Sequence, residues 1–116
     1  MVFAGIRNRV LAVEPGTAGD PVVTKSYVED MYGWKVHTLE PGNSIVFDVG
    51  TEIVIRSGKA TVVAGSGGGL ADLTRGADLP GGALAPANHL LLAPMSDGRG
   101  LRAESSVVFL ARGWLP

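Results

Sequence analysis

The sequence contains no cysteine, so disulfides, thiolate nucleophiles and cysteine metal ligands are excluded. Charged residues are also scarce, at 18% of the 116 residues, and the formal net charge is −1. Because basic residues are neither in excess nor gathered in one segment, we expect no nucleic-acid partner. The apolar runs are only a few residues long, so we expect no membrane-spanning segment.

Glycine and proline are plentiful by contrast, with 17 and 7 residues respectively. They gather in the stretches GSGGG (65–69) and PGGA (80–83) and recur singly between apolar segments. This distribution indicates many tight turns between short elements. The chain length fits one domain with one modest core.

Apolar segments between these turns have the length and composition of strands. They are residues 34–39, 44–49, 52–56, 60–64, 89–94, 101–104 and 105–115. Residues 65–88 are expected to be loop, with at most one helical turn near Leu70–Leu73. Residues 95–100 are expected to form a hairpin turn because they contain Asp-Gly. The pattern predicts a mainly β fold, a small β-sandwich or jelly-roll-like barrel.

One helix is expected, at about residues 21–32. Either Thr24 caps it, or Asp20 caps it with Pro21 in the first turn. Gly33 fits the left-handed position that commonly follows a helix. A helix this short is unstable alone in water, so its apolar stripe is expected to pack against another surface.

The N-terminal residues 1–18 are interpreted as a strand-like arm followed by a Pro/Gly-rich linker, and residues 19–116 as the β-sandwich domain. The arm either forms the first strand of its own sheet or adds to the sheet of a neighbouring subunit. The second alternative predicts an assembly interface, formed by apolar side chains of the arm and of the helix stripe. These residues are Ile6, Val10, Leu11, Val13, Val23, Tyr27 and Met31.

The two histidines, His37 and His89, are the best candidates for metal ligands. A small barrel that brought them close to Glu52 or Asp48 would resemble a cupin metal site. Neither histidine has a second histidine nearby in the sequence, and an ordinary hydrogen bond at a strand end explains each equally well. We therefore expect no metal, no cofactor and no catalytic site.

Other polar residues allow two interpretations. Glu52 and Arg56 share one face of a strand, and with Asp72 and Arg75 they form either a polar pocket or a solvated sheet face. Arg99 lies in the Asp-Gly turn, which either presents it to a partner or is simply a turn. The stretch GSGGG lacks the Lys-Ser/Thr of a phosphate loop, which leaves a flexible tip or a close approach of two backbones.

Two resemblances bear on function. The segment DPVVTKSYVED, residues 20–30, resembles a junction motif of phage tail-fibre proteins, in which it links successive modules. Together with GTEIVIRSGKATVV, GGLADLTRGADL, NHLLLAPMSDGRG and VVFLARGWL, it also resembles a group of short envelope-associated or exported proteins of Gram-positive, often thermophilic, bacteria. In that group the segment follows a signal sequence, from which the present N-terminus departs. Neither resemblance implies catalytic residues.

These observations lead to three functional hypotheses. The first is a structural, self-assembling subunit of an extracellular filament or cell-surface assembly, which polymerises by adding its N-terminal strand to a neighbour. The second is a virion component such as a tail-fibre, collar or decoration protein. The third is a cupin-like barrel that binds a small molecule. We expect the partner to be another copy of the chain.

Overall fold

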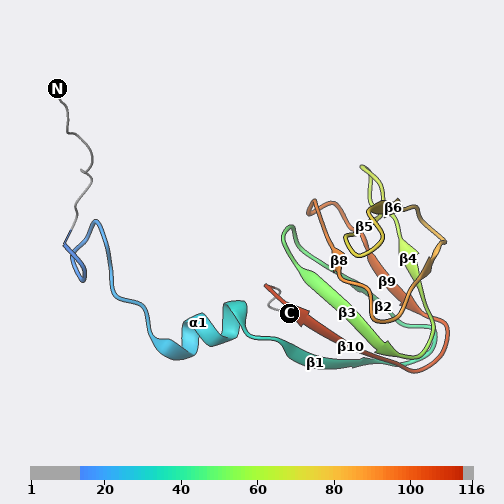
Figure 1. Cartoon of the computed structure of the whole chain (residues 1–116), viewed down its shortest axis with the longest axis horizontal. Helices are drawn as coiled ribbons and strands as arrows, with labels where there is room; N and C mark the ends of the chain where they lie inside the picture. The colour runs from blue at the N-terminus through green and yellow to red at the C-terminus, as the bar shows by residue number, and fades with distance from the viewer. Residues whose placement is uncertain (1–13, 114–116) are drawn as a thin grey trace.

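The computed structural model describes residues 14–113, which form a β-sandwich preceded by one short helix (Figure 1). In spatial order, the six-stranded sheet contains β1 (Lys35–Leu39), β10 (Val107–Arg112), β3 (Glu52–Ser57), β8 (Leu91–Leu92), β5 (Leu70–Asp72) and β6 (Ala77–Leu79). The four-stranded sheet contains β2 (Ser44–Val46), β9 (Gly100–Ala103), β4 (Ala60–Val63) and β7 (Leu84–Ala85). All neighbouring strands are antiparallel. The predicted mainly β, sandwich-like fold is confirmed.

The core lies between the two sheets and follows the alternation of the strands. In β10, Val107 and Phe109 are fully buried, whereas Val108 and Leu110 on the opposite face are only partly buried. Phe109 meets Phe47 edge-on, with ring centroids 5.9 Å apart. This period of two explains why the long strands were predictable, since one face is packed and the other is not.

The expectation of a loop over residues 65–88 is wrong, because this segment contains β5, β6 and β7. Leu70 and Leu79 are buried and lie opposite each other in the β5–β6 pair. Gly69 allows this pair to form, because a β-carbon there would overlap the Leu79 carbonyl. No helical turn forms at Leu70–Leu73, since Leu70 and Asp72 point inward as alternate residues of a strand.

The expected hairpin at residues 95–100 is also wrong. The strands on either side of it, β8 and β9, belong to different sheets, so the segment crosses from one layer of the sandwich to the other. Another strand is shorter than expected. β2 ends at Val46, and Val49 is exposed although Phe47 is buried.

The helix, α1, spans Lys25–Tyr32 and therefore begins later than the predicted residue 21. Thr24 has extended backbone angles, and its hydroxyl accepts a hydrogen bond from the Tyr27 N–H at 3.1 Å. The alternative with Thr24 as the cap is thus confirmed. Gly33 is not left-handed, since its φ is −75°. A β-carbon at Gly33 would instead crowd the Glu29 carbonyl, to which the Gly33 N–H donates.

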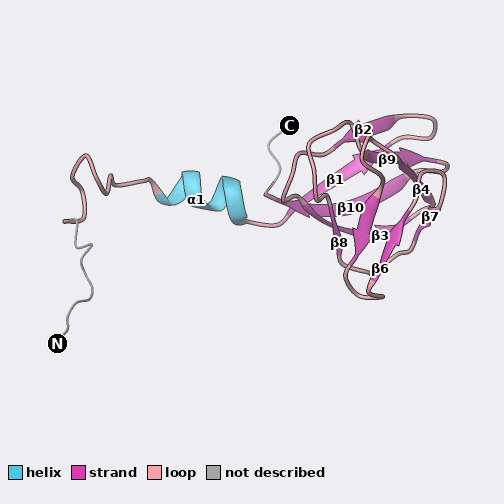
Figure 2. Cartoon of the chain, turned by 90° about the horizontal axis from the view of Figure 1, so that it is seen from above, coloured by secondary structure: helices cyan, strands magenta, loops and turns pink. Residues whose placement is uncertain are grey.

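The helix lies beside the sandwich and covers neither sheet in either view (Figures 1 and 2). None of its residues is buried, so packing of its apolar stripe on its own domain is not found. It touches the sandwich near its C-terminal end, where the Gly113 N–H donates to the Met31 carbonyl at 2.9 Å. The arm residues Ile6, Val10, Leu11 and Val13 lie outside the described residues.

Phe109→Ala tests the importance of the aromatic contact in the core. Phe109 is fully buried, so its truncation leaves a cavity and is expected to lower the free energy of unfolding by about 3–5 kcal/mol. Denaturant unfolding of the variant measures the change. Leu84→Ala, at a residue that is 56% exposed, is the control and should change stability by less than about 0.5 kcal/mol. Equal effects of both substitutions would contradict the assignment of the core.

Candidate functional site

The first candidate surface is the apolar stripe of the helix. Of the eight helical residues, Tyr27, Val28 and Tyr32 are 54%, 41% and 65% exposed. Met31 is partly buried next to them, and Val23 is exposed just before the helix. The spacing places the four helical side chains on one broad arc. Within the described residues nothing buries this arc.

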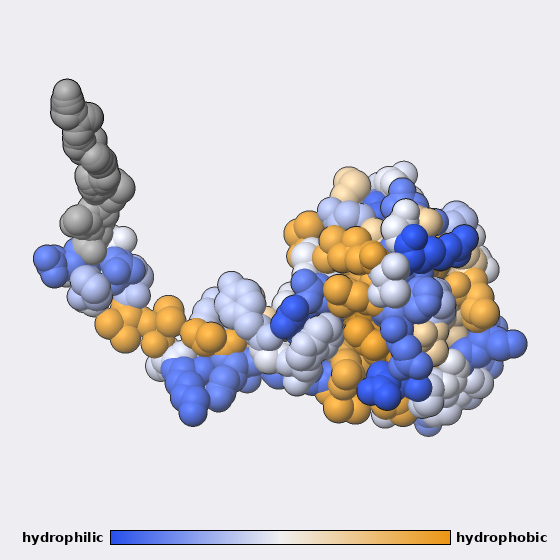
Figure 3. All heavy atoms as spheres, in the orientation of Figure 1, coloured by the Kyte–Doolittle hydropathy of each residue, from blue (hydrophilic) through white to orange (hydrophobic). Residues whose placement is uncertain are grey.

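The second candidate surface is the outer face of the six-stranded sheet. Val36 of β1, Leu110 of β10 and Val54 of β3 lie side by side in register across three strands. They point away from the core, because their strand neighbours Phe109 and Ile55 point into it. Figure 3 shows hydrophobic residues gathered in a band over this side of the sandwich. We call Val36, Leu110 and Val54 the apolar row.

The apolar row ends at an edge of the sheet that is unusually long for this molecule. β1 is an edge strand of five residues. The other edge strands, β6, β2 and β7, have three, three and two residues. An edge strand presents unpaired N–H and C=O groups that can pair with another strand, and short edges reduce that risk. Of the described edges, β1 therefore presents the longest row of unpaired backbone groups.

A polar cluster borders the apolar row where the helix joins the sheet. The Arg112 guanidinium donates from Nε to Glu52 Oε1 at 2.7 Å, and its Cζ lies 4.6 Å from the centre of the Trp34 ring. The pair joins neighbouring strands β3 and β10. Glu52 is therefore part of a half-exposed sheet-face pair, and Arg56 is exposed on the same strand. This agrees with the solvated-face interpretation for these two residues.

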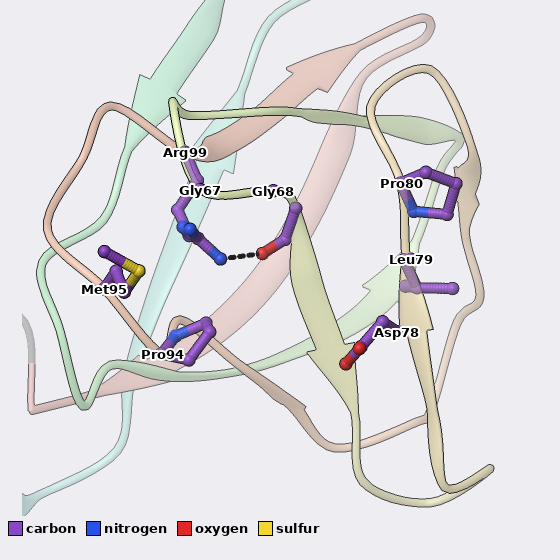
Figure 4. A pocket seen from close by; sticks show the side chains of 9 residues that line it. Gly67, Gly68, Asp78, Leu79, Pro80, Pro94, Met95 and Arg99 are labelled. Carbon is purple, nitrogen blue, oxygen red and sulfur yellow. Dashed lines mark hydrogen bonds between the residues drawn. The ribbon is translucent and has the colours of Figure 1, made fainter.

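A pocket of about 440 Å³ lies between the start of β5, the end of β6 and the connection from β8 to β9. Figure 4 shows Leu79 and Pro80 on one side of it, Pro94 and Met95 opposite, and the Arg99 side chain between them. Its lining residues are Gly67, Gly68, Gly69, Asp78, Leu79, Pro80, Pro94, Met95 and Arg99. Sequence reasoning missed this site, because its walls come from segments expected to be loop and turn.

Arg99 is buried and lines this pocket. Its Nε and Nη2 donate to the two carboxylate oxygens of Asp97 at 2.5 and 2.6 Å, and Nη1 donates to the Gly69 carbonyl. Asp97 also accepts from the Gly67 N–H at 2.7 Å. The interpretation in which the turn presents Arg99 to a partner is thus wrong. The glycines of GSGGG allow close approach, since a β-carbon at Gly65 would overlap Asp97.

Through its hydrogen bonds with Gly67 and Gly69, this ion pair joins two of the connections that cross between the sheets, one from β4 to β5 and the other from β8 to β9. The hydrogen bonds from the Arg99 guanidinium hold the pKa of Asp97 well below its usual range, despite the opposing effect of burial. The same contact raises the pKa of Arg99. Both groups therefore remain charged over the ordinary pH range, and the pair acts as a clip.

The histidines do not form the metal site that was considered. His89 Nδ1 lies 2.7 Å from Asp72 Oδ2. Burial raises the pKa of Asp72, but the hydrogen bonds from His89 and the Arg75 N–H outweigh it and lower the pKa. His37 stacks on Phe109 at 5.2 Å, and burial lowers its pKa. In residues 14–113, no three His, Asp or Glu side chains form a group that could hold a metal.

No family model, curated protein or solved structure matches the chain. Among the described residues, no helix is long and apolar enough to cross a membrane.

Asp97→Asn tests the clip through the pH dependence of stability. Because the pKa of Asp97 is lower in the folded state, its stabilising contribution is complete above the unfolded pKa of about 3.9 and is lost as the pH falls through the folded value. Wild type should therefore lose more thermal stability than the variant between about pH 5 and pH 2. The difference in melting temperature between the two should be largest near neutral pH.

Asp48→Asn, at an exposed carboxylate, is the control and should follow the wild-type curve. Parallel pH profiles for wild type and Asp97→Asn would contradict the role of the clip.

Proposed function

We propose that the protein is a structural, self-assembling subunit of an extracellular filament or cell-surface assembly, in which the N-terminal segment of one copy adds to the next. The observation that carries this proposal is the uncovered stripe of α1. An eight-residue helix with three exposed, largely apolar side chains is too short to be stable alone in water. A second copy of the chain supplies the missing surface.

The described contacts direct the helix away from its own sandwich. The hydrogen bond from the Gly113 N–H to the Met31 carbonyl holds the end of the helix. Lys35 Nζ, at the start of β1, lies 3.4 Å from Asp30 Oδ1. Both groups on this ion pair are well exposed, so it orients the junction more than it stabilises it. The helix and residues 14–24 before it therefore extend away from the sandwich, where another molecule can contact them.

The acceptor in this proposal is the free edge of β1. It is the longest edge among the described strands, and the residues that precede the helix include a segment with the pattern of a strand, 1–13. Addition of that segment to β1 of a neighbour would satisfy the backbone groups of both strands. The arm residues Ile6, Val10, Leu11 and Val13 would then contribute apolar contacts along the junction.

Such a contact joins two different surfaces, so every subunit both donates and accepts. A head-to-tail contact of this kind continues into a filament unless its rotation closes a ring. A virion component would use the same head-to-tail contact between subunits. Recovery of the protein from virions or from cell-surface material distinguishes the two functions.

Deletion of residues 1–13 tests the strand addition. The full chain is expected to form filaments or rings visible by negative-stain electron microscopy, and the shortened chain is expected to stay monomeric. A full-length variant with Ile6→Ser, Val10→Ser and Leu11→Ser keeps the length of the arm and should assemble poorly as well. An Asn8→Ser variant is the matched control and should assemble like wild type. Filaments that persist without residues 1–13 would contradict the strand-addition mechanism.

The pocket favours a second candidate function, the binding of a small ligand. Its volume of about 440 Å³ lies within the range of small-molecule sites. Its walls are mainly apolar, and Asp78 at the rim is exposed. Asp97 forms the ion pair with Arg99, and the charge of Asp78 also acts on this guanidinium. Two carboxylates thus face one guanidinium, which favours an apolar or cationic ligand.

A further inference from the structure

We infer that the apolar row on the outer face of the six-stranded sheet receives helix α1 of a second copy of the chain. This inference rests on the proposed self-assembly and names the surface that it uses. Strand addition at the edge of β1 accounts for residues 1–13, but it leaves the helix stripe and Val36 exposed, and Leu110 and Val54 only partly buried. Docking one on the other buries both.

The dimensions of the two surfaces agree. Eight helical residues extend about 12 Å along the axis. Val36, Leu110 and Val54 lie on three adjacent strands, which together span about 10 Å. Leu92 of β8 lies beyond Glu52 on the same face and extends the surface past the row. A helix that crosses the strands can therefore place its whole stripe on this face.

The charges at the borders also agree. Arg56 is exposed at the end of β3, next to Val54 on the outer face. Its guanidinium makes none of the hydrogen bonds or ion pairs found in residues 14–113. On the helix, Glu29 adjoins the aromatic arc, and its carboxylate is likewise without a partner in that part of the chain. A docked helix can bring this carboxylate to Arg56 at the rim.

The helix α1 cannot reach the apolar row of its own chain without breaking the contacts that hold it beside β1. Only Gly33 and Trp34 separate the helix from β1. A reversal there would break the hydrogen bond between Gly113 and Met31 and the contact of Trp34 with Arg112. In a second copy no such reversal is needed, because residues 14–24 provide slack between the added strand and the helix. The occupant is therefore the helix of another copy.

Glutamate substitutions on the sheet test the acceptor face. Val36→Glu and Val54→Glu place a carboxylate in the apolar row, so docking would have to bury a charge. Each is expected to raise the concentration at which the full chain assembles by about tenfold or more. Val46→Glu is the matched control, because Val46 and Val36 are both exposed valines on edge strands, at 53% and 68%. It should assemble like wild type.

Mixing two variants tests which surfaces meet. Tyr27→Ser with Val28→Ser removes the stripe but keeps the row, and Val36→Glu damages the row but keeps the stripe. Each variant alone is expected to be monomeric at a concentration at which wild type assembles. The 1:1 mixture is expected to form dimers of twice the 12.0 kDa chain mass, because one intact stripe meets one intact row. Light scattering after size exclusion measures the mass.

Different experimental outcomes would overturn the docking of the helix on the apolar row and the proposed self-assembly. A folded Val54→Glu chain that assembles like wild type overturns the inference and leaves strand addition at β1 in place. A mixture that remains monomeric while wild type assembles also overturns it. If Val54→Glu does not fold, the mixture decides, because Val36 is exposed and tolerates the charge. If the wild-type chain stays monomeric, both the proposed self-assembly and the docking of the helix on the apolar row are contradicted.

Discussion

The main physical constraint on this structure is the free-energy cost of forming a short helix in water without packing partners. Two turns of helix fix many backbone angles for few hydrogen bonds, so such a segment gains most of its stability from packing. In this chain the cap at Thr24 and the contact of Met31 with Gly113 support the two ends of the helix. The side chains between them remain uncovered.

The sandwich supplies a rigid surface for that purpose. Phe109 and its neighbours fill the core between the sheets, and the clip between Asp97 and Arg99 ties the β8–β9 connection to the β4–β5 connection beside the pocket. The outer face of the six-stranded sheet is thereby fixed in shape before any partner arrives. Surfaces that are formed in advance bind at a lower entropic cost, which would favour the proposed self-assembly.

The long strands were predictable because their alternation is local. In β10 every second residue is apolar and buried, and in β3 Ile53 and Ile55 follow the same alternation. That period is visible in the sequence. The short strands β5, β6 and β7 were missed because glycines that permit close backbone approach look the same in sequence as glycines in a loop. At Gly69 the deciding neighbour is Leu79, which the sequence does not place next to it.

The candidate surfaces were predictable only in part. The stripe of Val23, Tyr27 and Met31 follows from helical spacing, but Val23 lies before the helix and Met31 is partly covered. That the stripe faces away from its own domain could not be predicted, because it depends on Gly113, distant in the sequence. The apolar row required the register of three strands. The clip was missed because Arg99 in an Asp-Gly turn has the sequence signature of an exposed residue.

Hydrogen exchange of the helix amides in the full chain, measured across a range of protein concentrations, tests the central claim most directly. If a second copy covers the stripe, the amides of Lys25–Tyr32 exchange rapidly at high dilution and become protected as the concentration rises, together with those of β1. Protection that is already complete at high dilution, and that does not change with concentration, would show that the helix packs within its own chain and would contradict the account.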